Sequence, residues 1–88
     1  MPMNKSTEAV YDFFSKDTEA YKAVKEMVES GKPTAVIANW LEEYISQLDT
    51  RTKVKIYKAL MVSVEEATHW TNLANYLIGD HLNAEYYY

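Results

Sequence analysis

The amino-acid sequence predicts an all-α protein, a compact bundle of four to five short amphipathic helices that forms one domain over residues 1–88. Apolar residues recur at spacings of three and four through most of the chain, rather than at alternate positions. Only two glycines and two prolines interrupt this pattern, and a chain without cysteine has no disulfide framework. Together these features favour helices held by one small apolar core.

The first thirty residues contain two predicted helices. Ser6 is the expected N-cap of the first helix, and Asp17 is the expected N-cap of a second helix over residues 18–30. The apolar positions of the first helix are Val10, Phe13 and Phe14. The apolar stripe of the second helix comprises Ala20, Tyr21, Val24, Met27 and Val28. Gly31 fits the left-handed residue that follows a helix, and Pro33 prevents the helix from continuing.

The third predicted helix, over residues 35–48, has the clearest apolar stripe in the chain. Thr34 is its expected N-cap. Its charged residues Glu42 and Glu43 fall on the other side of the helix, away from the stripe. The stripe comprises Ile37, Trp40, Leu41, Tyr44, Ile45 and Leu48, which we expect to lie in the core.

A fourth element begins at Asp49 or Thr50, and residues 53–57 fit two patterns. The residues from Val54 onward have helical spacing, but residues 53–56 also alternate as in a short strand. A helix is favoured, because the alternation ends at Tyr57 and the sequence contains no second strand to pair with this one.

The apolar stripe changes direction near Val62–Ser63, where we predict a helix boundary or kink. Residues 63–66 also match a capping box, with Glu66 at the third helical position. A final helix is expected to run to about Ile78 and to end at Gly79. Residues 1–6 and 80–88 are predicted to be tails.

Charge is sharply segregated along the chain. The net charge is −4 and the isoelectric point is about 5.0, yet four Lys and Arg residues lie within residues 51–58 and none lies within residues 59–88. An acidic protein is not expected to bind phosphate backbones in general, so nucleic acid is an unfavoured partner. The charge instead suits a protein partner with a basic surface.

The sequence does not predict an enzyme. Glu66 and His69 form a Glu-x-x-His step, as in di-metal carboxylate bundles, but a capping box already explains Glu66. Asp80, His81 and His69 lack the spacing of a zinc site, and His81 is expected to be solvated beyond the last helix. No nucleophile motif or phosphate-binding loop is present, so no catalytic residue, metal or cofactor is predicted.

The predicted function is that of a small acidic, non-enzymatic protein-binding module. Many small proteins of phages and mobile elements have the same general character, and they inhibit a host defence or regulatory complex by occluding its surface. The expected protein-binding residues are acidic or aromatic: Glu42, Glu43, Glu65, Glu66, Trp70, Tyr76, Asp80, Tyr86, Tyr87 and Tyr88.

Two alternatives remain open. One is a helix-turn-helix-like DNA-binding regulator that uses the basic residues Arg51, Lys53, Lys55 and Lys58. The other is a dimeric di-metal carboxylate protein. The small core favours a homo-oligomer. The chain shows neither a membrane-spanning run nor a signal peptide, so the expected location is the cytoplasm, which is the host cytoplasm if a phage encodes the protein.

Overall fold

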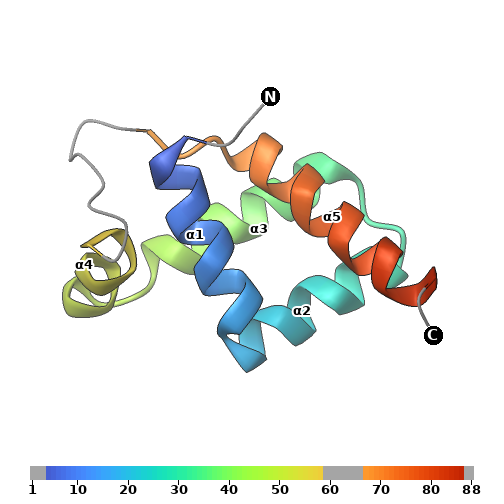
Figure 1. Cartoon of the computed structure of the whole chain (residues 1–88), viewed down its shortest axis with the longest axis horizontal. Coiled ribbons are helices and arrows are strands. Elements are labelled where there is room, and N and C mark those ends of the chain that lie inside the picture. The colour runs from blue at the N-terminus through green and yellow to red at the C-terminus, as the bar shows by residue number, and fades with distance from the viewer. Residues whose placement is uncertain (1–3, 59–66, 87–88) are drawn as a thin grey trace.

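Five α-helices make up the computed structural model, which describes residues 4–58 and 67–86 (Figure 1). The described residues contain no strand, which confirms the all-α class. None of the described helices is long and apolar enough to cross a membrane. The helices are α1 (Lys5–Lys16), α2 (Thr18–Glu29), α3 (Thr34–Ser46), α4 (Thr50–Lys58) and α5 (Trp70–Tyr86).

Helix α5 is the centre of the packing, although it is the last helix in the chain. It packs most extensively against α3, which passes behind it in Figure 1, and it also contacts α1 and α2. Helix α4 lies at one end of the molecule and packs mainly against α1. Much of the surface of α4 is therefore without a neighbour among the described residues.

The core is formed by residues from all five helices. Phe14, Ile37, Leu41 and Leu73 are the largest apolar side chains that are completely buried. Full burial of such a side chain stabilises a fold by about 1.5–3 kcal/mol. The remaining core residues are Ala9, Val10, Ala20, Val24, Ala38, Ile45, Ile56, Ala74 and Leu77.

The N-cap of α1 differs from the prediction. Asn4, and not Ser6, accepts a hydrogen bond from the backbone N–H of Thr7, at 2.9 Å. Ser6 lies inside the helix and is buried, with its hydroxyl 2.5 Å from that of Thr68. The prediction was wrong because Ser6 makes a tertiary contact with the segment that leads into α5.

The cap of α2 agrees with the prediction, and α4 begins at Thr50, one of the two expected starting residues. Asp17 accepts from the backbone N–H of Ala20 at 3.0 Å, and Asp49 accepts from that of Thr52 at 2.7 Å. Gly31 follows α2 with a φ of 73°, as its position predicted. Residues 53–57 are helical, which resolves the two patterns in favour of a helix.

At α3 the predicted cap was displaced by one residue. Pro33 occupies the N-cap position, and Thr34 is the first helical residue. Proline fits there because its fixed φ suits a helix start and its missing N–H would have no partner within the helix.

The end of α5 is the largest correction to the sequence analysis. The helix continues through Gly79 to Tyr86, so the predicted end at Ile78 and the predicted tail over residues 80–86 were wrong. A glycine in a helix interior costs only about 1 kcal/mol. Burial of Leu77 before it and His81 after it outweighs that cost. The predicted boundary near Val62–Ser63 and its capping box lie outside the described residues.

Candidate functional site

The predicted binding residues do not gather on one surface. Glu42 and Glu43 are exposed on α3, whereas Asp80 is exposed on α5. Trp70 is half-buried and packs against the core at the start of α5. Tyr86 is the last residue of α5. Glu65, Glu66, Tyr87 and Tyr88 lie outside the described residues.

Asp80 and Tyr76 have a role within the fold, because both contact Tyr11 of α1. The Tyr11 hydroxyl donates a hydrogen bond to the Asp80 carboxylate. This bond, with partial burial and the charge of Asp80, raises the pKa of Tyr11 to about 12. The Tyr11 and Tyr76 rings meet edge to face, with centroids 6.3 Å apart. This cluster joins α1 to α5.

The outer surface of α3 combines acidic and apolar side chains. Val36 is 47% exposed, and Asn39, Glu42 and Glu43 are also exposed. At about 100° per residue, Val36, Asn39 and Glu43 form one strip, with Trp40 on one flank and Glu42 on the other. We call Val36, Asn39, Trp40, Glu42 and Glu43 the α3 face.

Trp40 is held in place by a cluster of aromatic rings. Its ring stacks on that of Tyr44, with centroids 5.0 Å apart and an interplanar angle of 30°. Tyr44 in turn lies 6.1 Å from Phe13, and its hydroxyl donates to Asp17 over 3.4 Å. Burial and the charges of Asp17 and Glu19 raise the pKa of Tyr44.

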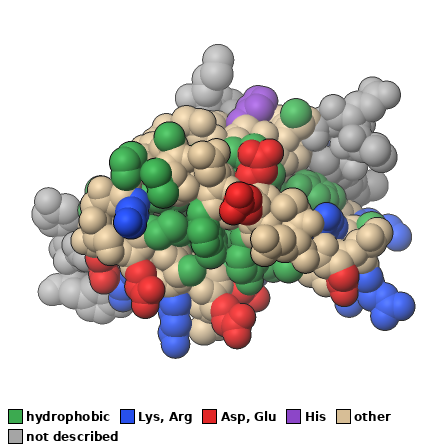
Figure 2. All heavy atoms as spheres, turned by 180° about the vertical axis from the view of Figure 1, so that it is seen from behind, with side chains coloured by type: hydrophobic (Ala, Val, Ile, Leu, Met, Phe, Trp, Pro, Cys, Tyr) green, Lys and Arg blue, Asp and Glu red, His purple; other side chains and the backbone are tan. Residues whose placement is uncertain are grey.

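These aromatic residues remain partly accessible to solvent. Phe13, Trp40 and Tyr44 are half-buried and pack against the edge of the core. Figure 2 shows hydrophobic side chains gathered in the middle of the face opposite to that of Figure 1, with acidic and basic side chains around them. An open groove of about 310 Å³ lies beside Trp40, lined also by Met27 and Lys32. The α3 face therefore borders an apolar surface.

The basic residues of α4 form a second exposed strip. Arg51, Lys55 and Lys58 are exposed and lie on one side of the helix together with Val54, which is 51% exposed. Lys53 lies on another side and is half-buried. We call Arg51, Val54, Lys55 and Lys58 the α4 face.

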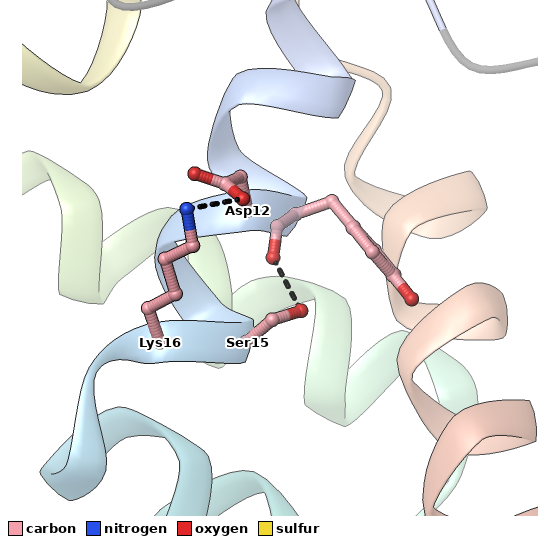
Figure 3. A network of polar contacts seen from close by, with 4 residues as sticks. Asp12, Ser15 and Lys16 are labelled. Atoms are coloured by element: carbon pink, nitrogen blue, oxygen red, sulfur yellow. Dashed lines mark hydrogen bonds and ion pairs between the residues drawn. The ribbon is translucent and has the colours of Figure 1, made fainter.

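The charges of the two faces have no ion-pair partners in the part of the chain that the structure describes. The ion pair that is present there joins Lys16 to Asp12 over 3.1 Å within α1, as Figure 3 shows. Beside it, the Ser15 hydroxyl donates to the backbone carbonyl of Tyr11. The acidic α3 face and the basic α4 face are thus open to partners outside the monomer.

The histidines do not form a metal centre among the described residues. No group of three histidine or carboxylate side chains gathers there to hold an ion. His69 is exposed, and its backbone N–H donates to the Thr7 hydroxyl at 2.9 Å. Glu66, the other member of the Glu-x-x-His step, lies outside the described residues.

His81 was predicted to be solvated, and this was wrong. It is only 7% exposed, and its ring packs against Tyr21 of α2 with centroids 4.6 Å apart. Burial lowers the pKa of His81, although the charge of Asp80 opposes this shift. The cause of the error is the continuation of α5 beyond Gly79, which turns His81 toward α2.

Sequence reasoning missed Trp40 and Tyr44 as surface residues, because both match the apolar stripe of α3. A signal was available in their angular positions. The buried residues Ile37, Leu41 and Ile45 define the centre of the stripe, and Trp40 and Tyr44 both lie toward the same edge of it. Large aromatic residues at the edge of a stripe are the ones that reach the surface.

Comparisons with protein-family models, with curated proteins and with solved structures found no match to this chain.

Proposed function

We propose that this chain is a non-enzymatic protein-binding module whose α3 face docks on the basic surface of another polypeptide. The observation that carries the proposal is the composition of the α3 face. Glu42 and Glu43 are exposed and unpaired in the described part of the chain, beside exposed Val36 and half-exposed Trp40. Carboxylates steer a basic partner to the surface, and an adjacent tryptophan supplies buried apolar area on contact.

The rigidity of Trp40 supports this role. A binding residue that is already ordered loses little conformational freedom when the complex forms. The stack on Tyr44 and the bond from Tyr44 to Asp17 fix Trp40 before any partner arrives. Tryptophan and tyrosine are also the residue types most enriched among those that dominate binding energies.

The role that we propose for this module is occlusion. By covering a basic surface of a host defence or regulatory complex in the cytoplasm, the protein blocks what that surface normally binds. Its small size and acidic charge support this mode of action. It requires no catalytic group, cofactor or metal.

The test begins with affinity capture from the native host and identification of the bound protein by mass spectrometry. Binding of that protein is then measured for two variants, Trp40→Ala and the charge reversal Glu42→Lys/Glu43→Lys. Trp40→Ala is expected to weaken binding by about 2 kcal/mol, or roughly thirtyfold in Kd. The charge reversal is expected to slow association and to remove most of its salt dependence.

A matched control reverses the same number of charges elsewhere. Glu8 and Glu29 are exposed on α1 and α2, outside the α3 face, so Glu8→Lys/Glu29→Lys is expected to bind almost as well as the natural sequence. If the control and the α3 variant lose the same affinity, only the net charge matters and the α3 face is not the site.

A second candidate function is nucleic-acid binding through the α4 face. The observation that favours it is the alignment of Arg51, Lys55 and Lys58 on one exposed side of a helix that follows a short turn after α3. Three phosphate contacts would give a slope of about −2.7 for log K against log salt. A mobility-shift titration at several salt concentrations tests this, with Lys55→Glu/Lys58→Glu as the variant expected to abolish binding.

A further inference from the structure

We propose that the basic surface bound by the α3 face is the α4 face of a second copy of this chain, so that two copies form a symmetric dimer. This inference rests on the proposed function, because it concerns the same α3 face. A second copy and a host surface compete for that face, so the dimer dissociates before the protein covers a host surface.

The two faces are complementary in charge, and each contains apolar side chains. The α3 face carries Glu42 and Glu43, and the α4 face carries three exposed basic residues. Each face also exposes one valine, Val36 at 47% and Val54 at 51%. Pairing the faces covers both valines and brings opposite charges together around them.

The faces also match in length. Val36 to Glu43 and Arg51 to Lys58 are both seven residues apart within a helix. At 1.5 Å per residue, each face extends for about 10 Å along its helix axis. Two helices that lie side by side can therefore place Glu42 and Glu43, at one end of the α3 face, against basic residues of the α4 face.

A two-fold axis allows both contacts to form at once. When α3 of one copy meets α4 of its partner, the same operation brings the first copy's α4 to the partner's α3. Within one copy, both faces are exposed and neither forms an ion pair in the described part of the chain. In the dimer, the exposed charges of each face thus meet opposite charges of the partner, and this happens at two equivalent contacts.

Charge exchange between the faces provides the test. Molar mass is measured by light scattering after size exclusion, at 50 mM and 500 mM salt. The natural sequence is expected to dimerise at low salt and to show at least a tenfold weaker dimer at high salt. Glu42→Lys/Glu43→Lys has two basic faces, Lys55→Glu/Lys58→Glu has two acidic faces, and each variant alone is expected to be monomeric.

Mixing the two variants is the decisive step. In a one-to-one mixture both contacts again join opposite charges, so a heterodimer is expected although neither variant dimerises alone. Circular dichroism confirms that each variant is helical. The control Glu8→Lys/Glu29→Lys is expected to remain a dimer.

Three results overturn the dimer. A mixture that stays monomeric does so, as does a natural dimer that neither reversal weakens. The third is a natural sequence that is monomeric at low salt. In that case, capture of a foreign protein by the natural sequence and not by Glu42→Lys/Glu43→Lys would mean that the proposed function stands without the dimer. If the natural sequence is a monomer that shifts the mobility of nucleic acid and Lys55→Glu/Lys58→Glu does not, the α4 face binds nucleic acid instead.

Discussion

Replacing Gly79 with alanine is expected to stabilise the protein, because Gly79 lies inside α5 and not at its end. Its φ is not in the left-handed region, and a methyl group added to it meets no atom within 4 Å. Alanine is favoured over glycine in a helix interior by about 0.8–1 kcal/mol. We expect the free energy of unfolding to rise by that amount, and the Tm to rise by about 4–8 °C for a chain of this size.

Gly31→Ala is the matched control. A methyl group at Gly31 also meets no atom within 4 Å, but the backbone there has a φ of 73°. Because a side chain is strained in this conformation, we expect a loss of about 1–2 kcal/mol. The same substitution is therefore expected to have opposite signs at the two glycines, and a clash with a distant residue explains neither effect.

Urea denaturation followed by circular dichroism at 222 nm measures both changes. The two midpoints are compared only if the slope of free energy against urea is unchanged. A loss of stability in Gly79→Ala would refute the reasoning, because it would mean that residue 79 is not in a helix interior. The end of the last helix that the sequence predicts, at Ile78, would then be correct.

Three further predictions test the contacts around α5 and the cap of α4. The lowered pKa of His81 means that the unfolded chain binds more protons than the folded chain near pH 6, so stability is expected to fall as the pH drops below about 6.5. Urea midpoints at pH 7.5 and 5.5 measure this loss of stability. We expect the full loss in the control His69→Gln and a smaller loss in His81→Leu. Tyr11→Phe removes the hydroxyl bonded to Asp80 and is expected to lower the free energy of unfolding in urea by about 1 kcal/mol. The absorbance titration of this variant at high pH is expected to lose the tyrosine with a pKa of about 12. An unchanged titration would mean that the raised pKa belongs to another tyrosine. Asp49→Ala removes the N-cap of α4 and is expected to lower the urea midpoint in the same assay, whereas Asp49→Asn, which keeps an acceptor oxygen, is expected to lower it much less.

Local sequence signals were sufficient wherever the chain's own neighbours decide the structure. Asp17 caps α2 through a backbone N–H three residues away, and Gly31 adopts the left-handed conformation that ends the same helix. Residues 53–57 are helical because no second strand is present in the described part of the chain to satisfy a strand's backbone groups. The cap at Asp17 and the turn at Gly31 each depend on residues a few positions apart.

Local signals failed wherever a distant contact decides the structure. Glycine is a residue type that often ends a helix, but burial of Leu77 and His81 against other helices extends α5 past Gly79. Serine is a common N-cap residue, but the hydroxyl of Ser6 contacts that of Thr68, sixty-two positions away. The same limit applies to the site, because a residue's place in an apolar stripe does not state how far the neighbouring helices cover it.

The basic residues of α4 have opposing effects on the stability of the monomer. Arg51, Lys55 and Lys58 are neighbours at spacings of four and three, and each like-charged pair costs about 0.2–0.5 kcal/mol in a helix. Arg51 also lies in the first turn, where the helix dipole disfavours a cation. Lys55 and Lys58 lie in the last turn, where the dipole favours a cation, and the charge of Lys55 helps to lower the pKa of Asp49, so these effects largely offset the repulsion. The charge of α4 therefore decides little of the stability of the monomer, and we propose that its role is to bind an acidic surface.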